Sequence, residues 1–110
     1  MDTWDITKME VGPSQPRVLR SDVEARVVAI NLPAGRKLGD HQVHERAYLV
    51  VADGEVEVQQ DHRTETGGPG FVAHFQANER HEVRATSDAR LLLILAPWPG
   101  AGHPRQRNAA

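Results

Sequence analysis

Short apolar runs separated by turn signals extend along most of the chain and restrict it to a β-fold. Strand-like runs are predicted at residues 23–32, 47–51, 55–59, 71–76, 81–85 and 90–96. In the third run Val56 and Val58 alternate with charged and polar residues, so the valines face a core and their neighbours face solvent. Short strands at intervals of about 8 to 12 residues predict an all-β sandwich or barrel.

The dipeptide Asp53-Gly54 lies between two of these runs. Because Asp-Gly flanked by strand-like runs is a strong signal for a tight turn, we expect residues 47–51 and 55–59 to pair as a hairpin. Residues 60–69 are polar and end in Gly-Gly-Pro, which predicts a loop.

The length of 110 residues fits one domain. Residues 1–22 are polar and interrupted by prolines, which predicts an N-terminal arm before a barrel over residues 23–97. Residues 98–110 are rich in Pro, Gly and charge, which predicts a flexible C-terminal tail. Residues 91–95 are apolar on both faces of their strand, so we expect one face to meet the core and the other a second subunit. A homodimer is therefore the expected assembly.

Composition excludes several classes of partner and chemistry. Lys and Arg total 13 against 15 Asp and Glu, so the basic field that nucleic acids require is absent and no nucleic-acid partner is expected. The chain has no cysteine, which excludes disulfides, cysteine-ligated zinc and thiol chemistry. No apolar run is long enough to cross a bilayer, and the first residues carry no secretory signal. We expect a cytoplasmic protein without a membrane partner.

Two segments that run from a glycine to a histidine carry the candidate chemistry. They cover residues 35–41 and 70–81 and end at His41 and His81. Strand alternation points both histidines toward the core. Neutral imidazole is a common ligand of divalent transition metals, and a barrel can bring two strands around one ion. Each histidine has an alternative role as a buried side chain that is hydrogen-bonded to backbone or water.

These segments resemble the paired motifs of the cupin superfamily. The first motif runs from a glycine through His-x-His and a glutamate to a second glycine, and Gly35, His41 and Gly54 stand at its first, second and last positions. The second motif runs from a glycine through Pro-x-Gly to a histidine, and Gly70 and His81 stand at its ends. The resemblance implies an all-β, cupin-type antiparallel jelly-roll β-barrel with an internal pocket, as in small single-domain bacterial cupins.

The chain departs from the family pattern at the metal-binding positions. Cupins usually hold a metal with three histidines and one glutamate, but Val43 stands at the second histidine position and Ala47 at the glutamate position. Asn78 replaces the glycine of Pro-x-Gly. His44 reaches the interior only if a bulge shifts the strand, whereas Glu45 keeps the inward phase. The metal motifs are therefore degenerate.

The cofactor implied by the resemblance is a divalent transition metal, namely Fe, Mn, Ni or Zn. Its candidate ligands are His41 and His81, with His44, Glu45 and His74 as further candidates. His74 contributes only if its face of the strand is the lumen.

Three functions remain open. The leading hypothesis is a mostly apolar pocket that binds a small organic molecule, with a weak or incomplete divalent-metal site. The alternative is a metal-dependent cupin enzyme, such as an isomerase or dioxygenase, that uses His41 and His81 with His44 or Glu45. The third is a structural or regulatory dimer with a vestigial pocket. The residues expected to line the pocket are His41, Val43, Ala47, Leu49, Val51, Val56, Val58, His81, Val83 and Ala85.

Overall fold

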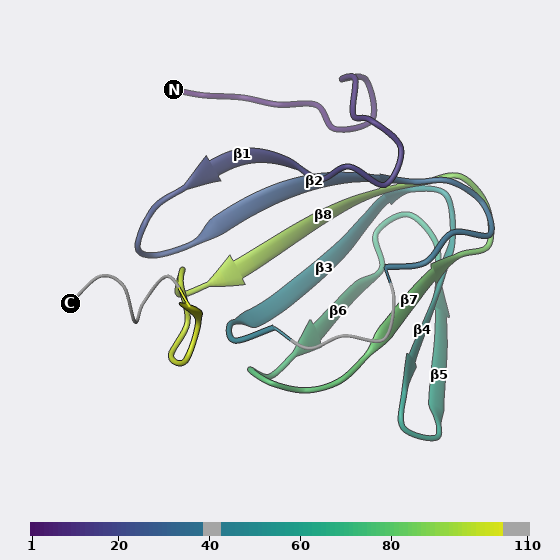
Figure 1. The fold of residues 1–110 in the computed structure, drawn as a ribbon. Helices are drawn as coiled ribbons and strands as arrows, with labels where there is room; N and C mark the ends of the chain where they lie inside the picture. Colours follow the sequence, from purple (N-terminus) through teal and green to yellow (C-terminus); the bar gives the residue numbers. More distant parts are fainter. Residues whose placement is uncertain (39–42, 105–110) are drawn as a thin grey trace.

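A computed structural model describes residues 1–38 and 43–104, and the part of the chain that it describes contains eight β-strands. They are β1 (Arg17–Ser21), β2 (Arg26–Leu32), β3 (Arg46–Asp53), β4 (Val56–Gln60), β5 (Arg63–Gly67), β6 (Val72–Phe75), β7 (Glu82–Ala85) and β8 (Ala89–Ala96). The strands form a five-stranded sheet in the order β1-β2-β8-β3-β6 and a three-stranded sheet in the order β5-β4-β7 (Figure 1). Within residues 1–38 and 43–104, no helix is long and apolar enough to cross a membrane.

All strand pairs are antiparallel, and the two sheets enclose one hydrophobic core, which confirms the predicted jelly-roll fold. Leu49 pairs with Leu93 and Val51 with Leu91 across β3 and β8, and these side chains point into the barrel. From the three-stranded sheet, Val56 and Val83 face them and are at most 1% exposed. The alternation predicted from the sequence therefore produces the core.

The order of the strands defines two ends of the barrel. At one end β3 and β7 begin while β4, β6 and β8 end, and we call this end the mouth. The opposite end contains the short turn at Asp53-Gly54, which carries the chain from the larger sheet to the smaller one. Figure 1 shows the strands of the two sheets spreading apart toward the mouth.

The turn at Gly54 does not make a hairpin. β3 pairs with β6 and β8, whereas β4 pairs with β5 and β7. The end of β3 is occupied instead by the segment before β6, because Val51 donates to the carbonyl of Phe71 at 2.9 Å and Gly70 donates to that of Val51 at 2.8 Å. The hairpin prediction is therefore wrong: the dipeptide marks a turn but does not determine which strands pair.

The predicted loop over residues 60–69 is also wrong, because it contains β5. β4 and β5 form the hairpin, with Gln60 opposite Arg63 and a positive φ of 53° at Asp61. Four of the five residues of β5 are exposed. Such an edge strand has no buried face, so it lacks the alternation by which strands are recognised in a sequence.

The expected N-terminal arm is fastened to the outer face of the larger sheet. Its last part includes β1, which pairs with β2. Arg90 of β8 donates through Nη1 to the carbonyl of Met9 at 2.8 Å, and Asn31 of β2 donates to that of Val11 at 3.0 Å. Val11 is 6% exposed. The arm therefore covers part of β2 and β8 (Figure 1).

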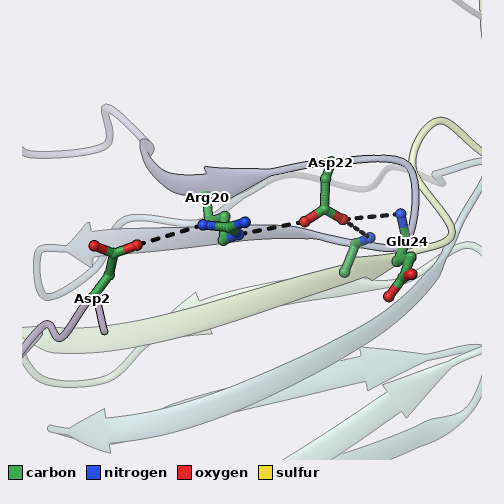
Figure 2. A network of polar contacts seen from close by, with 5 residues as sticks. Asp2, Arg20, Asp22 and Glu24 are labelled. Carbon is green, nitrogen blue, oxygen red and sulfur yellow. Dashed lines mark hydrogen bonds and ion pairs between the residues drawn. The ribbon is translucent and has the colours of Figure 1, made fainter.

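Arg20 joins the start of the arm to the turn between β1 and β2. Its guanidinium lies 3.5 Å from the carboxylate of Asp2 and 3.4 Å from that of Asp22 (Figure 2). Asp22 also accepts hydrogen bonds from the amides of Ala25 at 3.1 Å and Glu24 at 3.0 Å. These two amides lower the pKa of Asp22 below its usual value because they favour the charged carboxylate.

Substitutions at three glycines test the turn between the sheets. Gly54 has a φ of +79°, and an added Cβ would lie 2.7 Å from the Cα of Ala89. Gly35 has a φ of +82° but open space around it, so Gly35→Ala is expected to lower the free energy of unfolding by about 1–2 kcal/mol. Gly54→Ala should lower it further, whereas Gly68→Ala, with no atom nearer than 3.8 Å, should change it little. Urea unfolding measures the three effects, and equal losses for Gly54→Ala and Gly68→Ala would contradict the proposed packing.

Candidate functional site

The described candidates from the two sequence motifs lie at the mouth. Glu45 directly precedes β3, and His81 directly precedes β7. Both side chains are buried, with 1% and 5% exposure. His41, the remaining principal candidate, lies outside the described residues. The fold therefore places one carboxylate and one imidazole inward at the same end of the barrel.

Glu45 is held by the backbone of the C-terminal segment. Its Oε2 accepts a hydrogen bond from the amide of Gly100 at 2.6 Å. A buried carboxylate requires such a donor, because removal from water is costly for a charge. Glu45 faces inward, as strand alternation predicts.

His44 turns toward the same C-terminal segment. Its ring meets the ring of His103 edge to face, with 5.7 Å between centroids, and His103 contacts Trp98 at 4.8 Å. The guanidinium carbon of Arg26 lies 4.4 Å from the centroid of the Trp98 ring. Residues 98–103, expected to belong to a flexible tail, thus pack beside the mouth because Trp98 is partly buried against the core.

His81 packs inside the barrel with Val83 and Ala85 on its strand face. Its ring stacks on Phe75 with 3.7 Å between centroids and 8° between planes. Nδ1 lies 3.2 Å from the carbonyl oxygen of Glu79. Because a carbonyl only accepts, a neutral His81 that bonds there carries its proton on Nδ1 and keeps Nε2 as an acceptor.

His74 points away from the interior. It lies opposite Tyr48 in the register of β3 and β6, and the two rings are 4.7 Å apart. Both residues are exposed on the outer face of the larger sheet. The lumen is formed by the other face of β6, which carries Phe75.

The described donor groups, which do not include His41, do not by themselves form the metal centre that the sequence resemblance implies. Within residues 1–38 and 43–104, no group of three or more His, Asp or Glu side chains is arranged to hold a metal ion. The carboxylate of Glu45 is bound to Gly100, His44 contacts His103, and His81 lies flat on Phe75. The described residues therefore do not fit a cupin metal.

The predicted pocket residues form the core of the barrel. Ala47, Leu49, Val51, Val56, Val58, Val83 and Ala85 are all buried members of one cluster, and Val43 packs against it. Four of the largest, Leu49, Val51, Val56 and Val83, are at most 1% exposed. The pattern of the sequence identified which side chains point inward, but it could not indicate how completely they fill the interior.

Open space occurs instead along the side of the barrel. A cavity of about 330 Å³ is lined by Val58, Gln60, Arg63, Glu65, Phe71, Val72, Ala73, His74 and Phe75. It lies where β5 and β6, the edge strands of the two sheets, face each other. We call it the edge cavity. A second cavity of about 270 Å³ is lined by Gln59, Gln60, Asp61, Arg80, His81 and Glu82.

The sequence did not predict the edge cavity. Arg63 falls in the segment that was expected to be a loop, and Phe71 and Phe75 both line the cavity and pack in or against the core. The available signal was the alternation of Phe71, Ala73 and Phe75, which puts three apolar side chains on one face of β6 and the residue before it. It does not reveal that β5 stands across from them, because that neighbourhood depends on the sheet order.

The loop between β6 and β7 ties the two sheets together beside these cavities. Glu79 accepts hydrogen bonds from the side chain of Gln60 and, at 3.0 Å, from the amide of Gln76. Asn78 has a positive φ of 68° at the position of the motif glycine, and its amide donates to Val43 at 2.7 Å. The loop thereby fixes Gln60, which lines both cavities.

Solved structures share this fold at low sequence identity. An RmlC-like cupin from Desulfovibrio desulfuricans gives a TM-score of 0.79 at 21% identity over 88% of this chain and 97% of that chain. A protein with a double-stranded β-helix domain from Klebsiella pneumoniae gives 0.77 at 17% identity over 93% and 94%. A cupin superfamily protein from Desulfitobacterium hafniense gives 0.74 at 14% identity over 83% and 85%. At such identities the likeness shows the fold alone.

The sequence itself assigns the family. The family model described as a cupin domain matches residues 28–96, which is more than half of the chain. The search of curated proteins found no match to this chain. The matched region contains β3 to β8 and almost all of β2. The chain belongs to the cupin superfamily.

Proposed function

We propose that this cupin binds a small organic molecule in the edge cavity. The observation that carries the proposal is the cavity of about 330 Å³ between the two edge strands of a filled barrel. Its volume lies within the range of about 300–1,000 Å³ that is usual for ligand pockets. The proposal moves the binding site from the interior, where the sequence predicted it, to the gap between β5 and β6.

The lining of the edge cavity favours an amphipathic ligand. Val58, Phe71 and Phe75 supply apolar surface for a compact aromatic or aliphatic body. Arg63 supplies a guanidinium, which binds carboxylates in a two-pronged geometry. Arg63 pairs with Glu65 at 2.9 Å, but the two side chains are 78% and 52% exposed. Because such an exposed pair is weak, a ligand carboxylate can compete for Arg63.

The described donor set supports binding without a metal. The alternative, a metal-dependent enzyme, needs at least three protein ligands around one ion. Glu45, His44 and His81 each have other partners in the described part of the chain. An amphipathic ligand in the edge cavity uses none of these three groups.

We also propose that the chain forms a homodimer through the outer face of its larger sheet. Tyr48 and Val72 are 39% and 55% exposed there, and Val50 and Ile94 lie on the same face. The N-terminal arm covers the part of this sheet around β2 and β8. The apolar part beside β6 is the surface that a second copy would bury.

Carboxylic acids test the binding proposal directly. Benzoate, cyclohexanecarboxylate and hexanoate should raise the thermal midpoint by several degrees near 100 times their Kd, because binding then stabilises the fold by about 2.7 kcal/mol. Arg63→Gln should weaken binding of these acids by about tenfold, through loss of a charged hydrogen bond, and leave benzyl alcohol unaffected. Arg36→Gln, an exposed arginine in a turn, is the control. Equal affinities in both variants, or no binding at all, would reject the proposed site.

The metal content of the purified protein distinguishes the metal-free binding function from the metal-dependent enzyme. We expect purified protein to hold far less than one metal ion per chain, also after incubation with Mn, Fe, Ni and Zn salts, because the described residues offer no three-ligand site. Elemental analysis measures this. Stoichiometric metal that disappears in His41→Ala and His81→Ala but remains in the exposed His62→Ala control would favour the metal-dependent enzyme.

Light scattering after size exclusion tests the dimer. The wild type should have twice the chain mass of 12.2 kDa. Val72→Glu should give a monomer, because it places a charge from each copy in an apolar interface. Val23→Glu changes a residue that is 80% exposed in a turn and should remain dimeric. A dimeric Val72→Glu variant would argue against this face.

A further inference from the structure

The C-terminal segment closes over Glu45 by one side-chain contact and one very close backbone contact. The amide of Gly100 donates to Oε2 of Glu45 at 2.6 Å. A Cβ added to Gly100 would lie 2.7 Å from the carbonyl carbon of His44 and 3.1 Å from the amide nitrogen of Glu45. Only a glycine fits this approach. The contact is therefore specific to the residue present, which distinguishes residues 98–103 from a tail that rests on the surface.

Aromatic contacts hold the two ends of the same segment. Trp98 lies beneath Arg26 of β2 at 4.4 Å, and His103 contacts both Trp98 and His44. Within the segment, His103 donates to the carbonyl of Gly100 at 3.0 Å, which folds the segment back on itself. The segment thus makes a compact turn, and Gly100 in this turn binds Glu45.

Residues 98–103 lie beyond the end of β8 at Ala96 and belong to none of the described strands. The amide of Trp98 donates to the carbonyl of Val23 across a long distance of 3.4 Å. A segment that lies outside the strand ladders can open at a lower free energy than global unfolding requires. Opening also hydrates Glu45, so the carboxylate does not remain buried without a donor.

We propose that residues 98–103 form a strap that is fastened by the Glu45–Gly100 hydrogen bond and opens while the barrel stays folded. The closed strap buries the carboxylate of Glu45. The open strap presents this carboxylate beside the imidazole of His44 at the mouth, as an accessible acid. The strap and Glu45 lie at the start of β3 and the end of β8, apart from the edge cavity between β5 and β6.

Carboxylate labelling tests the strap in the full chain. A water-soluble carbodiimide with glycine methyl ester modifies accessible carboxylates, and peptide mass spectrometry reads the rate at Glu45. We expect slow labelling in the wild type and a rise of about tenfold or more in Gly100→Ala, because the added methyl group disfavours the closed strap. Gly68→Ala, with free space around it, is the matched control and should label like the wild type.

Amide exchange of Leu93 in β8 shows whether the barrel remains folded. Its exchange should stay slow in Gly100→Ala, since the strap opens separately. Labelling of Glu45 at the wild-type rate in that variant would overturn the proposal. So would a matching rise in the exchange of Leu93, which would mean that Glu45 becomes accessible by unfolding of the barrel.

Substitution of the acid gives a second test that does not depend on Gly100→Ala. Glu45→Gln keeps a side-chain oxygen that can accept from Gly100, whereas Glu45→Ala removes it. The amide of Gly100 should therefore exchange slowly in the wild type and in Glu45→Gln, and at least several-fold faster in Glu45→Ala. Equal exchange of the Gly100 amide in Glu45→Gln and Glu45→Ala would reject the proposed role of the Glu45–Gly100 hydrogen bond. Both measurements work without a ligand, so their outcome is independent of binding in the edge cavity.

Discussion

The antiparallel pairing of β3 with β8 is the interaction on which the rest of the barrel depends. It places Leu49 against Leu93 and Val51 against Leu91, and β2 and β6 extend the sheet on either side. These inward side chains meet the valines of the smaller sheet and leave little room between the sheets. The cavity beside His81 and the strap over Glu45 lie at the mouth, outside this filled centre. The edge cavity lies along the side of the barrel, between β5 and β6.

Local periodicity predicted most strands, because β2, β3, β4, β7 and β8 each bury at least one face. It failed where structure depends on distant partners. Asp53-Gly54 predicted a turn correctly, but the chain enters a second sheet there, and no local signal distinguishes that turn from a hairpin. β5 was missed because its side chains are exposed on both faces. Sheet order is a property of the whole chain, which explains the first error. The second error has a local cause, the lack of a buried face in β5.

The sequence predicted which candidate side chains face inward, but it did not predict where the cavities lie or how large they are. Alternation correctly placed Glu45 and His81 inward, and the departures at Val43 and Ala47 indicated an incomplete metal set. The cavity volume could not be predicted, since it depends on how closely the side chains of two sheets approach. The sequence did not predict the strap for a different reason. Glycine and proline suggest a flexible tail, yet Gly100 is required because the backbone approaches His44 too closely for any side chain.

The sheet order has a consequence for synthesis of the protein. β8, which lies between β2 and β3 at the centre of the larger sheet, is the last of the described strands in chain order. During vectorial synthesis, β2 and β3 emerge first and each must wait with one open edge until β8 leaves the ribosome. The larger sheet therefore forms only after β8 has been made, and such long-range pairing slows folding. The nascent chain exposes the apolar edges of β2 and β3 during that interval.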